Sequence, residues 1–343
     1  MKVSRARALG WLLAPLLAFS AVHAAKLPAT MRAAAIDQPG PAEVLTLHTL
    51  PVPRPGPDEV LIAVHTAGVG IWDTGVRRHP EDYMQPKFPL VLGTDGAGTV
   101  VAVGSSVARF RVGDPVYSYS WNNPQGGFYA EYVAVPAERV GRIPKNLDMT
   151  QAGAIATTAL TALQGVDDAL HLQAGQTVLI HGAAGGVGVL AVQFAKLRGA
   201  RVLGTASGED ELALARSLGA DAVVDGRSGD ILAAAQQFAP QGVDAVLGLA
   251  GGEPLERCID ALRPGGALAY PRGVHGPKPR PGLSPIDYDA VPGPQQYARL
   301  NAAIESLRFQ VPIAAQFPLA EAARAHQRIE AGHVLGKIVL NMH

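Results

Sequence analysis

The stretch Gly-Ala-Ala-Gly-Gly-Val-Gly at residues 182–188 has the composition of a phosphate-binding turn. A pyrophosphate requires backbone N–H groups that point toward it and no side chain in the way, and a glycine-rich turn at a helix N-terminus provides both. Ala183 stands where the usual fingerprint has its first glycine, so the pattern alone is weak. Its context is stronger, because a buried-strand pattern (177–181) precedes it and a helical pattern follows. We therefore predict a dinucleotide site rather than a turn that only packs.

The end of the next apolar run (201–205) bears on the choice of dinucleotide. A NAD site usually has an acidic residue at this point, to hold the ribose hydroxyls, but residues 204–207 read Gly-Thr-Ala-Ser. The missing acid favours NADPH, because a carboxylate would repel a 2′-phosphate. Three acids at 209–211 follow without a Lys or Arg, and such acids are also stabilising at any helix N-terminus. The sequence therefore predicts NADPH as the cofactor and leaves NADH as an alternative.

Two kinds of pattern must position these residues, and together they predict an α/β fold. Between about 31 and 150, short β-branched runs are broken by glycines, which is typical of a compact β-barrel. From 151 to about 285, strand and helix patterns alternate with short connections, which predicts a doubly wound parallel sheet of the Rossmann type. A Pro- and Gly-rich loop (271–294), two helical stretches and a terminal strand (336–340) follow.

Composition excludes several classes of protein. The 343 residues are 48% hydrophobic and 17% charged, which is the composition of a globular chain with a large core. Twenty-nine basic and 29 acidic residues balance, and no basic stripe indicates a nucleic-acid partner. Cys258 is the only cysteine, so a disulfide within the chain and a Cys-rich zinc site are both excluded.

The first 24 residues have the layout of a secretory signal peptide. Lys2, Arg5 and Arg7 precede an apolar run (8–22), and small residues at Val22 and Ala24 suit a signal peptidase. The alternative is a membrane anchor, but Pro15 interrupts a run that is short for a span of about 20 residues. We therefore expect cleavage, no stable membrane span afterwards, and an exported, periplasmic protein. If the true start is Met31, the protein is cytoplasmic instead.

Motifs from Met31 onward resemble a known family. They are "MRAAAIDQPGPAEVL", "AGVGIWD", "LGTDGAGTVVAVGSSVARFRVGDPVY", "GGFYAEY", "AGQTVLIHGAAGGVG" and "GHVLGKIVL". In this order they are similar to the zinc-independent medium-chain dehydrogenase/reductases, in the quinone oxidoreductase (zeta-crystallin-like) branch. The resemblance implies a GroES-like catalytic domain formed by residues 31–150 and 286–343. It would surround a Rossmann cofactor-binding domain at 151–285.

The resemblance also implies which residues bind the cofactor. Thr161 would lie against the nicotinamide, although a helical threonine also bonds its own backbone. Lys337 would reach the cofactor, unless it is simply a solvated lysine. The remaining residues implied here face the pyrophosphate, the adenosine ribose or the cofactor crevice: Gly185, Gly186, Val187 and Gly188; Thr205 and Ser207; Ala250 and Gly251.

Zinc-dependent relatives have ligands that this chain lacks. The segment matching "AGVGIWD" has no Cys, and Thr94 replaces the His of a Gly-His-Glu motif. The resemblance therefore implies that no metal is bound. Without a Lewis acid, the remaining chemistry is hydride transfer to an acceptor that is already electrophilic, a quinone or an α,β-unsaturated carbonyl.

Acceptor-site candidates come from aromatic and acidic residues. Trp72, Tyr117 and Trp121 could stack on a flat quinone, or could belong to the core. Asp73 could supply a proton to the product, or could organise its loop. We therefore treat Trp72 and Asp73 as the candidate catalytic residues.

Three departures from the family leave a second function open. Relatives often have Lys at Glu211 and Tyr at Gly226, beside the 2′-phosphate, and Asn at Gly70, beside the nicotinamide. The rival hypothesis is a non-catalytic exported binding module that retains the reductase fold. A predicted open sheet edge at "ALAYP" (267–271) makes a homodimer plausible, as in relatives.

Overall fold

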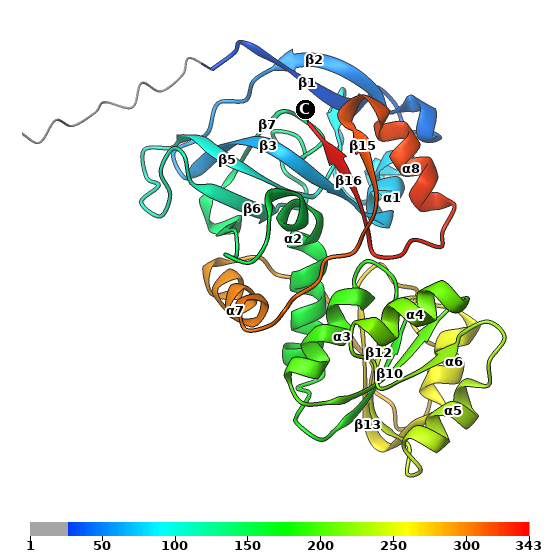
Figure 1. The fold of residues 1–343 in the computed structure, drawn as a ribbon. Helices are drawn as coiled ribbons and strands as arrows, with labels where there is room; N and C mark the ends of the chain where they lie inside the picture. The colour runs from blue at the N-terminus through cyan, green and yellow to red at the C-terminus, as the bar shows by residue number, and fades with distance from the viewer. Residues whose placement is uncertain (1–26, 343) are drawn as a thin grey trace, which may run out of the picture.

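The cofactor domain is built on a parallel sheet, drawn in green and yellow in Figure 1. The computed structural model describes residues 27–342. Six strands pair in the order β11-β10-β9-β12-β13-β14, and every neighbouring pair is parallel. Their bounds are β9 Thr177–His181, β10 Arg201–Ala206, β11 Ala222–Asp225, β12 Val243–Gly248, β13 Leu262–Pro271 and β14 Ile286–Tyr288.

Helices cover both faces of this sheet, which explains the buried apolar run in its inner strand β9. Val178 and Ile180 of β9 pack on the side of α3, whereas Leu179 between them packs on the side of α5 and α6. Alternate side chains of a strand point to opposite faces, so a strand buried on both faces is a continuous apolar run. The helices are α3 Gly188–Leu197, α4 Glu209–Ser217, α5 Ile231–Phe238 and α6 Glu253–Ile259.

Both ends of the chain build the second domain, as the resemblance implies. The C-terminal strand β16 (Lys337–Asn341) pairs antiparallel with β3 (Glu59–Val69), with Ile338 opposite Val69. They belong to a seven-stranded sheet in the order β15-β16-β3-β5-β6-β8, in which β7 also pairs with β3. The other members are β5 Asp95–Val103, β6 Pro115–Tyr119, β7 Tyr132–Pro136, β8 Val140–Arg142 and β15 Ile313–Pro318.

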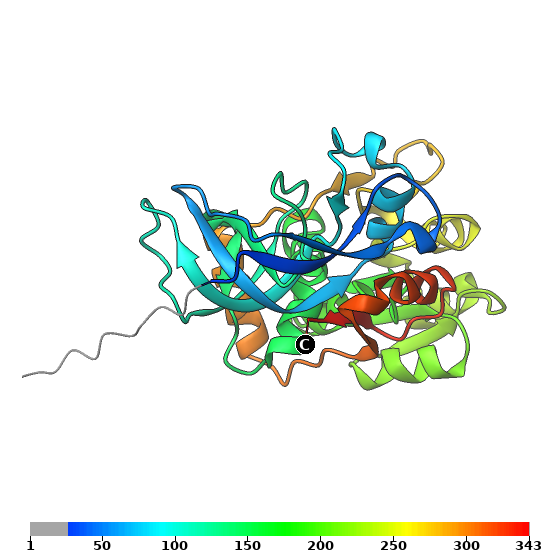
Figure 2. The ribbon, with the colours of Figure 1, turned by 90° about the horizontal axis from the view of Figure 1, so that it is seen from above.

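A smaller sheet and three helices complete this domain (Figure 2). The sheet has the order β2-β1-β4. Its strands are β1 Thr30–Ile36, β2 Thr46–Pro51 and β4 Leu90–Val91, and the helices are α1 Ile71–Arg78, α7 Pro294–Glu305 and α8 Ala322–Glu330. The predicted α/β architecture, a GroES-like barrel domain plus a Rossmann domain, is confirmed.

One helix is shared by the two domains. Helix α2 (Met149–Gln164) packs against β3 and β5 of the barrel and against α3 of the Rossmann domain. Asp148 caps it, because its carboxylate accepts a 2.7 Å hydrogen bond from the N–H of Gln151. Every residue from 152 to 164 is buried, so α2 is a common core element.

Two details differ from the sequence predictions. Strand β14 lies just past the predicted domain boundary at 285, so the Rossmann sheet extends beyond it. The prediction of an open edge at "ALAYP" is wrong, because Ala269–Pro271 pair with Ile286–Tyr288. A three-residue strand inside a Pro-rich loop has too few residues to show a period of two.

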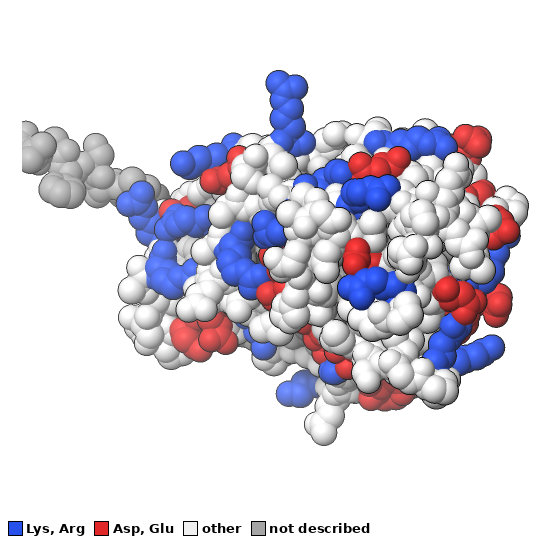
Figure 3. Space-filling model, turned by 90° about the horizontal axis from the view of Figure 1, so that it is seen from below, with Lys and Arg blue, Asp and Glu red and all other residues white. Residues whose placement is uncertain are grey.

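Other predictions lie outside what the structure describes. The predicted signal peptide and its cleavage site belong to residues 1–24, which are not among the described residues 27–342. Within that described range, no helix is long and apolar enough to cross a membrane. The face drawn in Figure 3 carries basic and acidic side chains interspersed, without a broad patch of one sign.

Cys258 offers a test of this packing. Its side chain is fully buried in α6, and burial raises the pKa of the thiol to about 12. Because the thiolate is the reactive form, we expect no reaction with a disulfide reagent at pH 8 in the native protein. One thiol per chain should react in denaturant, and fast reaction of the native protein would contradict the buried position.

Candidate active site

The glycine turn between β9 and α3 is open where a ligand would lie. A Cβ added to Gly185 would meet only the carbonyl oxygen of Gly182, at 3.5 Å. The N–H groups of Gly186 and Val187 have no acceptor among residues 27–342, and they stand at the positive end of α3. Gly188 has another role, since its Cβ would lie 2.1 Å from the Gly182 carbonyl oxygen. The turn therefore fits a pyrophosphate, with Gly188 needed for the close packing of α3 on the strand.

Lys337 brings the barrel domain against this turn. The N–H of Gly336 donates to the carbonyl of Ala184 at 3.1 Å, and the Lys337 side chain lies beside Gly186. The lysine is only 3% exposed, so the alternative of a solvated lysine is wrong. Its ammonium lies 5.7 Å from the centre of the Trp72 ring, on its face. The structure thus brings together a predicted cofactor residue and a predicted acceptor residue.

Other predicted cofactor residues have protein partners. The Thr161 hydroxyl donates to the carbonyl of Thr157 in its own helix at 2.9 Å. Thr205 is buried, and its hydroxyl oxygen lies 2.7 Å from Nδ1 of His181 and accepts from the N–H of Gly182 at 3.2 Å. Thr205 thus holds the start of the glycine turn, and its contact with a ribose stays a prediction.

The predicted adenosine end of the site is lined by carboxylates. The N–H of Ser207 donates to Glu211 at 2.7 Å, and the N–H of Gly208 donates to Asp225 at 3.0 Å. His333, in the loop before β16, contacts Asp210 at 2.8 Å and Glu211 at 2.9 Å. These acids, Asp210 first, raise the pKa of the imidazole. Ala250 and Gly251 follow the carboxyl end of β12, as predicted for residues bordering the crevice.

Trp72 occupies the space that the glycine at position 70 leaves. A Cβ on Gly70 would lie 2.2 Å from an atom of the indole ring. The indole N–H donates to the hydroxyl oxygen of Thr94 at 2.7 Å. The Gly70 departure from the family pattern therefore has a structural reason, since no side chain at that position fits beside this indole.

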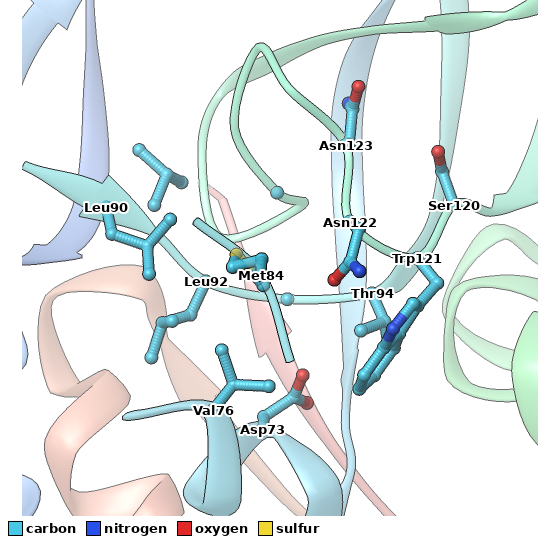
Figure 4. Close-up of a pocket in the computed structure, with 13 residues that line it drawn as sticks. Asp73, Val76, Met84, Leu90, Leu92, Thr94, Ser120, Trp121, Asn122 and Asn123 are labelled. Atoms are coloured by element: carbon cyan, nitrogen blue, oxygen red, sulfur yellow. The ribbon is translucent and has the colours of Figure 1, made fainter. Parts of the chain in front are cut away.

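The other two aromatic candidates lie in different surroundings. Tyr117 is fully buried, and its hydroxyl donates to Asn301 at 2.7 Å, so it belongs to the core. Trp121 lines a cleft with a volume of about 30 Å³, together with Thr94 and Asp73 (Figure 4). Tyr83 packs edge-on against Trp121, with ring centres 5.8 Å apart.

Asp73 lies at one end of this cleft and is 1% exposed (Figure 4). Its Oδ2 accepts from the N–H of Gly70 at 2.8 Å and from the hydroxyl of Tyr129 at 3.0 Å. Burial is the main cause that raises the pKa of this carboxyl to about 7, and the negative charge of Asp95 adds to it. The bond to Gly70 caps α1, so the loop-organising role is present.

Sequence reasoning missed the side chains behind Tyr129. His326 Nε2 lies 3.2 Å from the Tyr129 hydroxyl, and His326 Nδ1 lies 2.8 Å from Arg77. Arg77 is fully buried and forms a 2.5 Å ion pair with Glu330. Only the spacing of Asp73 and Arg77, four residues apart on one helix, hinted that they act together. His326 and Tyr129 come from distant segments, and nothing in the sequence links them.

Asp95 completes a buried group of charges. It is fully buried, its Oδ2 accepts from the N–H of Thr157 at 2.8 Å, and its Oδ1 has no hydrogen-bond partner in the described part of the chain. Burial raises its pKa, and the charge of Lys337 opposes that rise. Burial also lowers the pKa of Lys337, which both carboxylates oppose.

Comparisons with known proteins agree with this architecture. A model of the alcohol dehydrogenase GroES-like domain matches residues 56–145, and a model described as zinc-binding dehydrogenase matches residues 186–285. A quinone oxidoreductase of Pseudomonas aeruginosa is 32% identical over 318 residues, which are 88% of this chain and 96% of that protein.

Solved structures cover nearly the whole chain. A structure described as an NAD-dependent alcohol dehydrogenase is 33% identical, with a TM-score of 0.84, and the match covers 91% of this chain and 100% of the other. The Escherichia coli quinone oxidoreductase in complex with NADPH is 25% identical, with a TM-score of 0.81 and coverage of 91% and 100%.

The fold and the open glycine turn define the class: a two-domain oxidoreductase with a Rossmann domain inserted into a GroES-like domain. Within that class, the chain belongs to the medium-chain dehydrogenase/reductase family. Quinone oxidoreductases are among its relatives. Between residues 27 and 342, no group of three or more His, Cys, Asp or Glu side chains is placed to hold a metal ion.

Two glycine substitutions separate folding from binding in the turn. Gly188→Ala places a methyl group 2.1 Å from a carbonyl oxygen, so we expect a loss of at least about 1–3 kcal/mol in the free energy of unfolding. Gly185→Ala meets nothing closer than 3.5 Å and should leave stability within about 1 kcal/mol of wild type. Its methyl group enters the open side of the turn, so nucleotide affinity should fall. Urea unfolding and nucleotide titration measure the two effects, and equal stabilities would contradict the assignment of Gly188.

Proposed function

We propose that this protein is an NADPH-dependent, zinc-free reductase of quinones or α,β-unsaturated carbonyls. The observation that carries the proposal is the open glycine turn beside Lys337 and Trp72, at the contact between the two domains. The free N–H groups of Gly186 and Val187 would hold the pyrophosphate. NADPH, when bound, supplies a hydride from its nicotinamide ring.

The barrel domain would receive the acceptor. Trp72 is half-buried, and its indole is fixed by the bond to Thr94, which gives a rigid flat wall against which a planar ring can stack. Trp121 extends the apolar lining through the cleft, and Lys337 places a positive charge on the face of Trp72. An acceptor that becomes negatively charged on reduction is stabilised by this cation.

The absence of zinc is part of the proposal. The segment that contains Gly70 lacks the Cys of zinc-dependent relatives, Thr94 replaces their His, and the indole of Trp72 fills the space between Gly70 and Thr94. A backbone glycine and a threonine hydroxyl are poor zinc ligands beside thiolate and imidazole. The reaction therefore requires an acceptor that does not need Lewis-acid activation.

A second candidate is an exported binding module that retains the fold. The carboxylates of Glu211 and Asp225 at the predicted adenosine end favour this candidate, since both already accept hydrogen bonds from backbone N–H groups there. The free N–H groups of the turn favour the reductase. Export to the periplasm, with the cytoplasm as the alternative if Met31 is the true start, and a homodimer also stay proposals.

Nucleotide titration distinguishes the two candidates. Binding beside Trp72 should quench tryptophan fluorescence, with saturation at micromolar NADPH, on the order of −8 kcal/mol. Trp72→Phe should lose most of the quenching, whereas Trp121→Phe should retain it. Saturable quenching together with anaerobic NADPH consumption on adding a quinone would support the reductase. No saturation at millimolar NADPH or NADH would leave the binding module.

Glu211 should weaken NADPH binding specifically. Glu211→Gln keeps an oxygen that can accept from Ser207 but removes a negative charge beside the 2′-position. We expect NADPH to bind about three- to tenfold more tightly, since partly screened charge contacts contribute roughly 1 kcal/mol, and NADH to be unchanged. Glu209→Gln, which alters an exposed neighbour, is the matched control. An equal gain for both nucleotides would contradict a 2′-specific effect.

A further inference from the structure

The buried charges behind the acceptor site do not balance when all are ionised. Asp73 and Asp95 are two carboxylates, and Lys337 is one ammonium; each is at most 3% exposed. The charge of Arg77, which is also buried, is compensated separately by its ion pair with Glu330. Low dielectric makes a net buried charge costly, so one proton on a carboxylate brings the group to neutrality. The group therefore holds one exchangeable proton.

Charge pairing assigns that proton to Asp73. Of the two carboxylates, Asp95 has the larger effect on the pKa of Lys337. Asp95 is thus the main partner of the ammonium and stays ionised longer. The like charge of Asp95 in turn favours the protonated form of Asp73.

A chain of hydrogen bonds then selects the oxygen that carries the proton. Arg77 can only donate, so it donates to Nδ1 of His326, which places the ring hydrogen on Nε2. Nε2 faces the Tyr129 oxygen, and the Tyr129 hydroxyl donates to Oδ2 of Asp73. Oδ2 also accepts from the N–H of Gly70. With two donors on Oδ2, the proton of Asp73 belongs on Oδ1.

The chain does not conduct protons from the surface. A guanidinium does not release its proton at ordinary pH, so Arg77 closes the inner end. The pKa of His326 is lowered to about 3 by burial and by Arg77, which keeps the imidazole neutral. Arg77, His326 and Tyr129 are therefore positioning residues, and exchange with solvent must occur on the other side, through the cleft.

The cleft provides that route. Its volume of about 30 Å³ is enough for a water molecule, which needs roughly 10–15 Å³ and polar partners. Its walls include the Thr94 hydroxyl, and two further wall atoms, Ser120 Oγ and Asn123 Oδ1, are buried without a hydrogen-bond partner among the described residues. Thr94 accepts from Trp72, so its own hydrogen is available to the cleft. Water in this cleft would connect Asp73 to Thr94, whose hydroxyl oxygen accepts from the indole of Trp72.

We propose that Asp73 is the acid of this reductase, and that its Oδ1 proton passes through the cleft to the reduced acceptor. The acceptor takes up a hydride, which carries two electrons and one proton, and becomes an oxyanion or enolate. Asp73 gives up its proton to that oxygen, directly or through one water, which leaves an ionised Asp73 and either a hydroquinone or an enol. The enol then tautomerises to the saturated carbonyl compound. Solvent protonates Asp73 again. This inference rests on the proposed function for the reaction, whereas the protonation of Asp73 does not.

The pH dependence of turnover tests the role in the reaction. Because the protonated carboxyl is the active form, kcat should fall as the pH rises above about 7. Tyr129→Phe removes a bond to the charged form, so the fall should move to higher pH by about one unit. Asp95→Asn removes a like charge, so the fall should move to lower pH. Tyr117→Phe deletes another buried hydroxyl, which bonds Asn301 and does not contribute to the pKa shift of Asp73, and should not move the profile.

Opposite shifts are a result that a merely structural role would not produce. Loss of packing would lower stability in all three variants without moving the pH profile. Profiles that coincide, or that move in the same direction for Tyr129→Phe and Asp95→Asn, would overturn the assignment.

A second measurement uses the protein without nucleotide or acceptor. Infrared spectroscopy should show a protonated carboxyl band that titrates near pH 7 and is missing in Asp73→Asn. The folded pKa is raised above 3.8, so stability from the protonated form is complete below that pH and is lost as the pH rises through about 7. The free energy of unfolding of wild type should therefore fall relative to Asp73→Asn over this range.

The two measurements test separate parts of the proposal. A titrating band with no turnover of any quinone or enone would sink the proposed function and leave the protonation of Asp73 intact. Turnover with no such band, or with a band that Asp73→Asn retains, would sink the assignment of the acid and leave the reductase. The test does not depend on correct folding of Asp73→Asn, because Tyr129→Phe should shift the pH at which the same band titrates.

Discussion

The placement of three ionisable side chains inside a contact between two domains constrains the rest of the structure. Two carboxylates and one ammonium can be buried together only if their polar atoms are held in place and their charges are nearly compensated. The ammonium comes from β16, one carboxylate from the start of β5, and the other from α1. The barrel must therefore bring three distant segments to one point, and the glycine turn must lie close enough to cover the lysine.

Much of this could be predicted from the sequence. The alternation of strands and helices after residue 150 specifies a parallel sheet because each period is strong and each connection short. The glycine turn was predictable for the same reason, and Gly188 shows that one glycine of the motif serves packing whereas Gly185 stays open. The short strand β14 was not predictable, because it is a pairing partner created by the tertiary fold.

The buried residues of the site were harder to predict than its exposed ones. Lys337 and Asp95 are single polar residues in apolar surroundings, and a single sequence cannot show whether such residues face solvent or the interior. Tyr117 is the opposite case. Its aromatic ring suggested a stacking role, but the side chain is buried in the core. The indole of Trp72 takes the volume that a side chain at position 70 would need. The order of residue types does not reveal which side chain fills a given volume.

The pairing of β16 with β3 has a consequence for how the chain acquires its structure. Strand β3 (59–69) cannot complete its pairing until β16 (337–341) has been synthesised. The whole Rossmann domain lies between these two strands in the sequence. Until β16 docks, the barrel lacks a central strand, and Asp73 and Asp95 have no cation beside them. Like charges then disfavour the compact state, so ionisation opposes closure of the barrel until the lysine arrives. The Rossmann domain has its own local contacts, whereas completion of the barrel requires the two ends of the chain to meet.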